Sequence, residues 1–401
     1  MLQTDYIHVP YGKAVYGEAE KEAVMNVLNT STQMGKHVRE MEQRVAALYA
    51  KKYGIMVNSG SSALYLAADL MNFEPGSEIL TPALTFSTTV APLIKKGWVP
   101  AFIDVEEGTY NVDVNKVAEM ITPKTKAMVI PNLIGNLPDW KVLREIADKH
   151  GIFVLEDSAD TLGAEIGGAS SGRFTDMSTT SFYGSHIINC AGNGGMLCVN
   201  TEAFYDRGRL LRSWGRSSSL FVESEKIENR FNVEIEGIPY DAKFVFEEPG
   251  YNIEPSELGA AFGLVQLDNL AKNIDDRTSN YARMREFFSQ WEEFFILPKQ
   301  LPDSRTGWLA FATTLRETAP FLRRDMQIFL EKRNIQTRTV FTGNILRQPG
   351  FKHQPHKAAK GGYPEADKGM RGGMLLACHH GLNDAQISHV MESVSEFMKN
   401  L

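Results

Sequence analysis

Short apolar runs alternate with amphipathic stretches over roughly the first 250 residues of the chain. The apolar runs have the length of strands and predict strands over residues 55–57, 78–82, 101–105, 127–132, 153–156, 177–182 and 195–200. The amphipathic stretches predict helices over residues 63–71, 117–121 and 140–150. This alternation indicates an α/β domain built on a mostly parallel sheet. Several runs end in Gly, Ser, Asn or Asp, and ligands bind at the carboxyl ends of strands in such sheets, so the chemistry is expected there.

The second half of the chain has a different pattern. Residues 213–246 are polar and charged without a sustained period, which predicts a long excursion, either a hairpin or a binding loop. Helical patterns follow over residues 255–274 and 277–293, and the remainder is expected to form a smaller α+β domain. We therefore expect a large domain over residues 1–250 and a smaller C-terminal domain over residues 251–401.

Composition narrows the choice of partners. The chain has 42 Lys and Arg against 49 Asp and Glu, a formal net charge of −7, which gives no electrostatic footprint for nucleic acid or an anionic membrane. Its three cysteines are too few for a disulfide framework and fit a reducing compartment. The first residues lack a signal-peptide pattern, and no apolar run reaches the ~18 residues of a membrane span. We expect a soluble cytoplasmic protein that binds neither nucleic acid nor membranes.

Two strand ends carry candidate chemistry. Residues 58–63, Asn-Ser-Gly-Ser-Ser-Ala, lead from a strand into a helix whose first amides and hydroxyls suit a phosphate, although by itself the segment fits a plain serine N-cap better. Residues 154–160, Val-Leu-Glu-Asp-Ser-Ala-Asp, place Asp157 and Asp160 at the end of an apolar strand. An acid there can bind a cofactor cation or simply make a turn, and the residues alone leave both interpretations open.

Two further segments complete the set. Residues 179–188 contain Ser181 and His186 and precede a Gly-Asn-Gly-Gly run over residues 192–195. By itself, His186 is more typical of a partly buried structural histidine than of a catalyst. Residues 249–252, Pro-Gly-Tyr-Asn, indicate by themselves only a turn before a helix.

The order and spacing of these four segments resemble the DegT/DnrJ/StrS family of sugar aminotransferases, which are fold-type-I enzymes that use pyridoxal 5′-phosphate. The resemblance runs from about Tyr11 to the C-terminus and includes Tyr16-Gly17, Met34-Gly35, residues 82–87 and residues 336–338. It implies a homodimer in which each chain has a large domain with a mostly parallel central sheet and a smaller C-terminal α+β domain.

The resemblance also implies cofactor contacts. Gly60, Ser61 and Ser181 would hold the cofactor phosphate, and Asn252 would reach the phosphate in the neighbouring subunit. Phe86 would stack on the pyridine ring, although a lone Phe after a strand is usually part of the core.

Acidic and basic positions complete the implied site. Asp157 would pair with the ring nitrogen and keep it protonated, and Asp160, which stands where the aminotransferases usually have Gln, is included among the cofactor contacts. Arg338 is a candidate for binding a carboxylate or diphosphate of the substrate, because Arg offers a bidentate fork, and a structural ion pair fits it equally well. Asn193 replaces an acid and Glu254 replaces an Arg of the family pattern, which puts the substrate contacts in doubt.

One departure decides the expected function. In the family's aminotransferases, a lysine five residues after the phosphate-binding serine forms the Schiff base, and here that position is His186. No lysine occurs between Lys149 and Lys226, and imidazole cannot form an imine, so the cofactor should be held without a covalent bond. This histidine resembles the 3-dehydratases of the same family. In them, L-glutamate converts the cofactor to pyridoxamine 5′-phosphate, which condenses with the C4 ketone of a nucleotide-linked 4-keto-6-deoxy sugar.

The resemblance therefore implies a lyase of deoxysugar biosynthesis. His186 would act as the base while the C3 hydroxyl leaves, and a 3-deoxy-4-keto sugar and ammonia would be released. Two alternatives remain, an aminotransferase with its lysine elsewhere and a non-catalytic relative that binds the cofactor or the sugar. The run Cys378-His379-His380 has no recognised zinc spacing, so no metal is expected.

Overall fold

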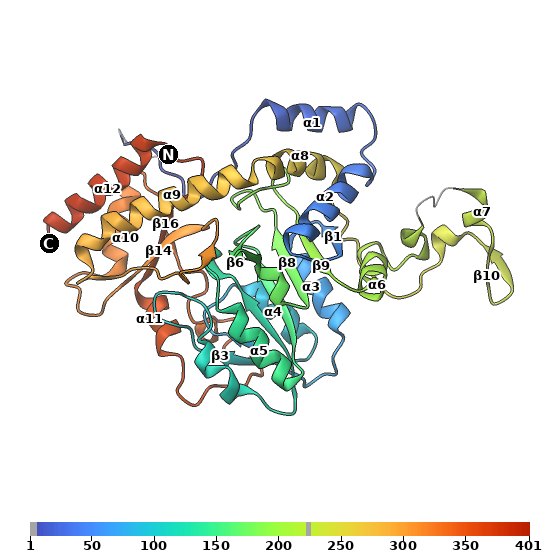
Figure 1. The fold of residues 1–401 in the computed structure, drawn as a ribbon, viewed down its shortest axis with the longest axis horizontal. Helices are drawn as coiled ribbons and strands as arrows, with labels where there is room; N and C mark the ends of the chain where they lie inside the picture. Colours follow the sequence, from blue (N-terminus) through green and yellow to red (C-terminus); the bar gives the residue numbers. More distant parts are fainter. Residues whose placement is uncertain (1–5, 222–225) are drawn as a thin grey trace.

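A seven-stranded sheet organises the first half of the chain in the computed structural model, which describes residues 6–221 and 226–401 (Figure 1). The strand order is β1-β9-β8-β5-β4-β2-β3, with β9 antiparallel to both of its neighbours and the other pairs parallel. The strands are β1 (Tyr53–Val57), β2 (Glu78–Pro82), β3 (Val99–Ile103), β4 (Thr125–Pro131), β5 (Phe153–Ser158), β8 (Met177–Ser181) and β9 (Gly195–Val199). All seven predicted strands form, with ends that differ by at most two residues, so the mostly parallel sheet is confirmed.

Alternate side chains along the strands enter separate cores on the two faces of the sheet. On β4, Ala127 and Val129 pack with α3, α4 and α6, whereas Met128 and Ile130 pack with α5. On the edge strand β1, Met56 packs with α2 and α8. These helices are α2 (Lys36–Leu48), α3 (Gly60–Met71), α4 (Ser87–Lys95), α5 (Trp140–His150), α6 (Glu202–Arg212) and α8 (Glu257–Asp268). Both faces of the sheet are therefore covered by helices, as a mostly parallel sheet requires.

A smaller antiparallel sheet, of order β12-β14-β16-β15, organises the C-terminal part of the chain. Its strands are β12 (Phe295–Ile296), β14 (Ala310–Leu315), β15 (Arg338–Thr339) and β16 (Gly373–Ala377). The helices around it are α9 (Leu270–Phe288), α10 (Arg323–Lys332), α11 (Pro364–Gly372) and α12 (Asp384–Lys399). The predicted domain boundary at residue 250 stays a prediction. Helix α8, which follows this position, packs against α1 (Glu18–Leu28) and α2 from the start of the chain.

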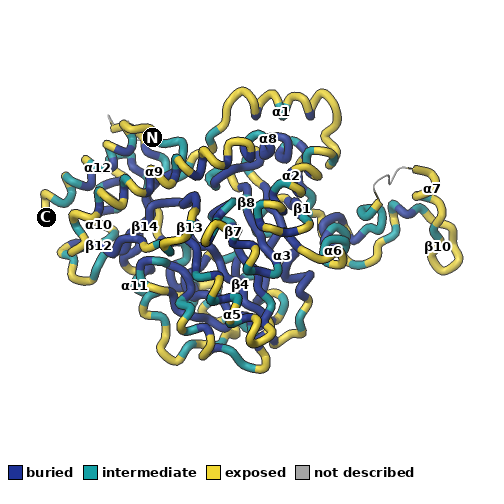
Figure 2. The backbone as a smooth tube through the Cα atoms, in the orientation of Figure 1, coloured by how far each residue is buried: buried dark blue, intermediate teal, exposed yellow. Residues whose placement is uncertain are grey.

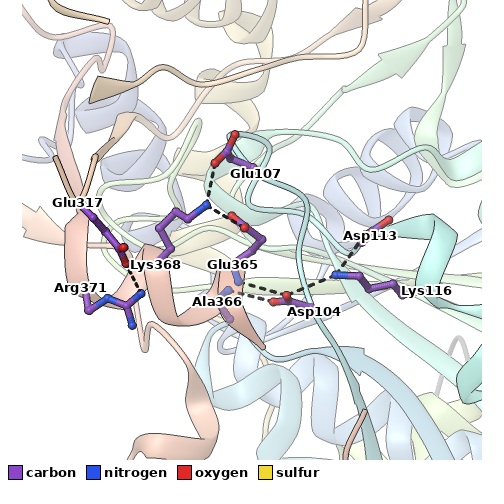
Figure 3. Close-up of polar contacts among 9 residues, drawn as sticks. All are labelled: Asp104, Glu107, Asp113, Lys116, Glu317, Glu365, Ala366, Lys368 and Arg371. Carbon is purple, nitrogen blue, oxygen red and sulfur yellow. Dashed lines mark hydrogen bonds and ion pairs between the residues drawn. The ribbon is translucent and has the colours of Figure 1, made fainter. Parts of the chain in front are cut away.

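Charged side chains join the two sheets where α11 begins (Figure 3). Asp104 follows β3, is fully buried, and accepts hydrogen bonds from the backbone amides of Glu365 (3.2 Å) and Ala366 (3.0 Å). A carboxylate at this position pairs with amides that the first turn of a helix leaves without partners. Lys368 bridges Glu107 and Glu365, at 2.8 Å from each. These contacts fix α11 beside the edge strand β3.

Three helix predictions are wrong in extent. The helix predicted over residues 277–293 is the later part of α9, which begins at Leu270 and ends at Phe288. Residues 117–121 form only the 3-10 turn η2 (Ala118–Met120), because Pro123 follows and the residue before a proline disfavours helical backbone. The predicted helix over residues 255–274 is divided at Asn269, between α8 and α9, and asparagine favours helix ends over helix interiors. Among the described helices, none combines the length and apolar character needed to cross a bilayer.

The remaining short elements connect these layers. They are β6 (Glu165–Ile166), β7 (Ala169–Ser170), β13 (Ser304–Arg305), η1 (Val114–Lys116), η3 (Leu133–Gly135), η4 (Ser171–Phe174), η7 (Ser289–Trp291) and η8 (Ile345–Arg347).

The predicted excursion projects from the body of the molecule (Figure 1), and much of it is exposed (Figure 2). Its tip is a hairpin of β10 (Val233–Ile235) and β11 (Ile238–Tyr240), with positive φ values of 50° and 82° at Glu236 and Gly237 in the turn. The other elements are η5 (Ser217–Leu220), α7 (Ile227–Arg230) and η6 (Ala242–Phe244). We call the described residues 213–221 and 226–246 the arm. Of the two predicted alternatives, the hairpin forms.

Candidate active site

The carboxyl ends of the parallel strands border a cavity of about 390 Å³. Seven of the predicted site residues line it: Gly60, Ser61, Phe86, Asp157, Asp160, Ser181 and His186. They lie at or just after the ends of β1, β2, β5 and β8, so residues far apart in the chain meet at one edge of the sheet. The two other predicted residues, Asn252 and Arg338, lie outside this cavity.

The N-terminus of α3 forms one part of the wall. Ser59 is the N-cap, since its hydroxyl accepts a hydrogen bond from the Ser62 amide at 3.0 Å. Gly60 lies against Ser181, because a Cβ at Gly60 would stand 2.6 Å from the Ser181 Cβ. Because Ser59 is the N-cap, the Ser61 hydroxyl is not used for capping. The hydroxyls of Ser61 and Ser181 both lie at the cavity, beside helix amides that lack intrahelical partners. This set of donors fits a phosphate.

Asp157 lies at the end of β5 and is 5% exposed. The Thr89 hydroxyl donates to its Oδ2 at 2.8 Å, and the Ala159 amide donates to its Oδ1 at 3.2 Å. Burial raises the pKa of Asp157, and these two hydrogen bonds oppose the rise. A cation placed against this carboxylate would favour its charged form, so the site fits a protonated ring nitrogen.

Asp160 lies on the same wall, and its Oδ2 accepts a hydrogen bond from the Ile134 amide at 2.8 Å. Burial raises the pKa of Asp160 to about 7 against the effect of this hydrogen bond, and the charge of Asp157 adds to the rise. Asp160 can therefore hold or release a proton near neutral pH.

His186 lies in the loop after β8 and is partly buried. Its Nδ1 is 3.3 Å from the Ser181 carbonyl oxygen, which can only accept, so Nδ1 carries the proton and Nε2 is free to take one. Burial lowers the pKa of His186 to about 4. The imidazole is therefore neutral at neutral pH, and its Nε2 can accept a proton. No lysine lines the cavity in the part of the chain that the structure describes.

The sequence did not single out several polar groups of this wall. The Tyr11 hydroxyl is buried and has no hydrogen-bond partner among residues 6–221 and 226–401, so it is available to a bound molecule. Burial raises the pKa of Tyr11, which keeps the hydroxyl protonated as a donor. Ser185 also lines the cavity, and so does Asn193, which the sequence marked only as a departure from the family pattern. The only feature of the sequence that could have pointed to Tyr11 as a site residue is that the family resemblance begins there.

A second chamber of about 440 Å³ adjoins the cavity, since Tyr11, Phe86 and Phe341 line both spaces. Phe86 is 48% exposed and so is not part of the core. Arg338 lines this outer chamber, with its guanidinium carbon 5.3 Å from the centre of the Tyr11 ring. Its Nη1 donates to the Thr337 carbonyl at 2.7 Å, and no described carboxylate pairs with it, so the ion-pair alternative finds no support.

Asn252 is exposed and lies at the base of the arm, where an isolated β-bridge pairs it with Ser213. Glu254 accepts a hydrogen bond from the Ser213 hydroxyl at 2.5 Å. Glu254, which replaces an Arg of the family pattern, therefore has a hydrogen-bond partner within the chain.

The sequence model of the DegT/DnrJ/EryC1/StrS aminotransferase family matches residues 15–395. The chain belongs to this family. It is 32% identical over 397 residues to a dTDP-4-dehydro-2,6-dideoxy-D-glucose 3-dehydratase from Saccharopolyspora spinosa, covering 96% of this chain and 85% of the relative. It is 32% identical over 349 residues to a GDP-4-keto-6-deoxy-D-mannose 3-dehydratase from Yersinia pseudotuberculosis, covering 85% and 86%. The solved structure of E. coli GDP-4-keto-6-deoxy-D-mannose-3-dehydratase with bound hydrated PLP has a TM-score of 0.88 at 26% identity, covering 97% of this chain and 99% of that chain.

Membership of the DegT/DnrJ/EryC1/StrS family confirms the resemblance, the fold type and the family's dependence on pyridoxal 5′-phosphate. The cavity itself fits that cofactor. Ser61 and Ser181 provide hydroxyls for a phosphate, Asp157 provides a buried carboxylate, and the Tyr11 hydroxyl lacks a partner within the described chain. The chain is therefore an enzyme of a pyridoxal-phosphate-dependent, sugar-modifying family.

Proposed function

We propose that this DegT/DnrJ/EryC1/StrS family enzyme removes the C3 hydroxyl of a nucleotide-linked 4-keto-6-deoxy sugar and forms a 3-deoxy-4-keto sugar. The observation that carries the proposal is His186 on the wall of a cavity that no lysine lines within the described residues. Imidazole cannot form an imine, so the cofactor is held without a covalent bond. Two relatives at 32% identity carry the name of a sugar 3-dehydratase, which supports the same reaction class.

The cofactor is held by the cavity residues that the sequence pattern singled out. Those that would touch it are Gly60, Ser61, Phe86, Asp157, Asp160 and Ser181, all of which line the cavity. Ser61 and Ser181 bind the phosphate together with the first amides of α3, and Asp157 keeps the ring nitrogen protonated. When bound, pyridoxamine 5′-phosphate supplies an amine for the C4 ketone and a ring that takes up electrons.

His186 moves the proton. Its Nε2 is free because Nδ1 faces the Ser181 carbonyl, and burial keeps the ring neutral. With the cofactor and substrate bound, Nε2 would accept the proton lost from C4′, and the imidazolium would return one to the C3 hydroxyl. The hydroxyl would leave as water, while the electrons of the broken C–H bond replace those of the broken C–O bond. A general base of this kind contributes ~10²–10⁴-fold to the rate. A lysine would instead shuttle a proton to or from sugar C4 and complete a transamination.

The outer chamber suits the rest of the substrate. A nucleotide-linked sugar carries a diphosphate beyond the sugar ring, and the chamber continues the cavity past Tyr11 towards Arg338. The Arg338 guanidinium has no carboxylate partner among the described residues and offers a fork for a diphosphate, or for a carboxylate of L-glutamate. L-glutamate is the amino donor in this proposal.

Two copies of the chain form the working enzyme in this proposal. Asn252 is exposed and outside its own cavity, which fits a residue that reaches the phosphate in a neighbouring subunit. The arm beside it exposes large apolar side chains, namely Phe221, Ile227, Phe231, Ile235, Ile238, Tyr240, Phe244 and Phe246. A second copy accounts for both features, because it would cover this apolar surface and receive Asn252.

Turnover of a substrate panel tests the proposal. The enzyme is incubated with pyridoxal 5′-phosphate, L-glutamate and GDP-, CDP-, UDP- or dTDP-linked 4-keto-6-deoxyhexoses, and ammonia and the mass of the sugar are measured. We expect ammonia release and a sugar that has lost one oxygen. An amino sugar formed without ammonia would instead indicate the aminotransferase alternative. No turnover with any of the sugars would favour a non-catalytic relative.

A further inference from the structure

A fully buried arginine behind the His186 loop has no carboxylate partner in the part of the chain that the structure describes. Arg277 of α9 is 0% exposed, and no acidic side chain among the described residues pairs with it. Burying a charge is costly, and buried charges are normally paired. Arg212, the other arginine buried in the described chain, follows that rule, since its Nη1 is 2.6 Å from a carboxylate oxygen of Glu42. The missing partner at Arg277 therefore needs an explanation.

Backbone carbonyls take the place of a carboxylate around Arg277. Its Nη2 donates to the carbonyl oxygens of His186 at 3.0 Å and Ser185 at 3.4 Å. Its Nη1 donates to the carbonyl oxygens of Trp308 at 3.0 Å and Leu309 at 3.3 Å. The planar guanidinium thus joins the loop that carries His186 to the segment that leads into β14.

His380 supplies the remaining acceptor. Its Nδ1 accepts a hydrogen bond from Arg277 Nε at 3.1 Å, so a proton on the ring sits on Nε2. Burial, followed by the charge of Arg277, lowers the pKa of His380 to about 3, so the ring stays neutral beside the cation. All five N–H donors of Arg277 are then used, and none is left for a substrate or cofactor.

The charge of Arg277 also acts on His186 through space. The other titratable groups on the described cavity wall are Tyr183, whose ring stands edge-on to His186 at 5.8 Å, and Tyr11, Asp157 and Asp160. Burial lowers the pKa of His186 first, and the charge of Arg277 adds to this effect. A positive charge disfavours a second positive charge nearby, so it opposes protonation of the imidazole.

We propose that Arg277 is a positioning residue that acts through His186 by clamping the backbone of residues 185–186 against the segment before β14. Because no described carboxylate pairs with Arg277, its charge stays uncancelled beside the imidazole. This inference rests on the proposed role of His186 as the base. Arg277 itself is not among the residues that line the cavity.

Two variants separate the clamp from the charge. Arg277→Lys keeps the charge, but its single ammonium cannot reach both pairs of carbonyls, and Arg277→Gln also loses the charge. We expect kcat to fall by about tenfold to 10²-fold in both variants, because a displacement of about 1 Å near the reacting atoms has this effect. The acid limb of the kcat profile should move to higher pH only in Arg277→Gln, because the charge that opposes protonation of His186 is gone.

A measurement without turnover decides the inference independently of the proposed function. Hydrogen exchange of residues 182–190 reports on the clamp. Ring-labelled histidine NMR, with the His186 signal assigned by its loss in His186→Asn, reports on the charge. We expect faster exchange of this loop in both Arg277 variants and a raised His186 pKa in Arg277→Gln.

Arg323→Lys is the matched control. Arg323 also donates to backbone carbonyls, of Met370 and Gly373 at 3.2 Å each, but it does not contact the His186 loop. It should change neither loop exchange nor the His186 signal. Wild-type exchange and a wild-type His186 titration in the Arg277 variants would overturn the inference, whatever their activity. If these readouts move but His186→Asn retains turnover, the proposed function fails and the clamp stands. Should Arg277→Gln not fold, exchange in Arg277→Lys decides.

Discussion

The cavity and the arm differ in how far they bury their side chains. In the cavity wall, polar groups such as Asp157 are buried and hydrogen-bonded within the chain. In the arm, Ile227 is 71% and Ile238 63% exposed, and Figure 2 shows how the arm differs from the buried strands of the large sheet. Because apolar burial is the main source of stability, an arm that leaves such groups uncovered is incomplete by itself. In our proposal, one chain provides the buried polar groups of the cavity, and a second copy covers the exposed apolar surface of the arm.

A large loss of turnover is expected in the cavity, from Asp157→Asn. Losing the carboxylate that keeps the ring nitrogen protonated should lower kcat by about 10²–10³-fold, the usual effect of removing one electrostatic contact to a reacting group. Asp104→Asn is the matched control, since Asp104 is also buried but accepts from α11 amides outside the cavity. It should lower stability and leave turnover per folded molecule unchanged. Near-normal turnover of Asp157→Asn would remove the cofactor role of this residue.

The arm should give a smaller effect on a different observable. Ile238→Ser should raise the dimer dissociation constant by about tenfold or more, since burying such a side chain is worth about 1.5–3 kcal/mol. Sedimentation at several concentrations measures the shift. Leu322→Ser is the control, because Leu322 is 67% exposed but lies outside the arm. Equal dissociation constants for Ile238→Ser and wild type would show that the arm does not meet a second copy.

The sequence located seven residues of the cavity wall, because strand ends carry polar residues such as Asp157 and Ser181 and because the order of these segments resembles the family pattern. Tyr11 could not be found in this way, since its segment has no period and is placed by a long-range contact from its amide to the Gln336 side chain. Arg277 was also missed, because an arginine in an amphipathic helix normally faces solvent and its partners are carbonyls of distant loops. Periodicity therefore finds strands and their ends, and it does not find contacts made by irregular segments.

Mixed dimers test whether Asn252, at the base of the arm, contributes to the cavity of a second copy. Combining an Asn252→Ala variant with a His186→Asn variant should give hybrids in which one site carries both changes and the other carries neither. Because half of the dimers are hybrids at equal mixing, we expect about a quarter of wild-type activity. If the mixture stays inactive after the dimers have re-associated, Asn252 does not contribute to the active site of the neighbouring subunit.

Acid should weaken the body of the molecule and spare the arm, which contains no histidine. Burial lowers the pKa of His379 to about 4, so the unfolded state takes up a proton first as the pH falls. The stability from the neutral ring is present above pH ~6.5 and should fall by ~1.4 kcal/mol per pH unit between there and about 4. Chemical denaturation at pH 7, 5.5 and 4.5 measures this slope, which His379→Asn should reduce and the exposed-site variant His353→Asn should leave unchanged. An unchanged slope in His379→Asn would assign the acid sensitivity to other groups.

The rate of ammonia release per folded dimer in His186→Asn tests the central claim most directly. The variant should still bind pyridoxamine 5′-phosphate, because none of the proposed phosphate contacts involves residue 186. Ammonia release should fall by ~10²–10⁴-fold, the usual contribution of a general base. A fall of less than about tenfold, with the fold and cofactor binding intact, would show that His186 is not the base and would contradict the dehydratase proposal.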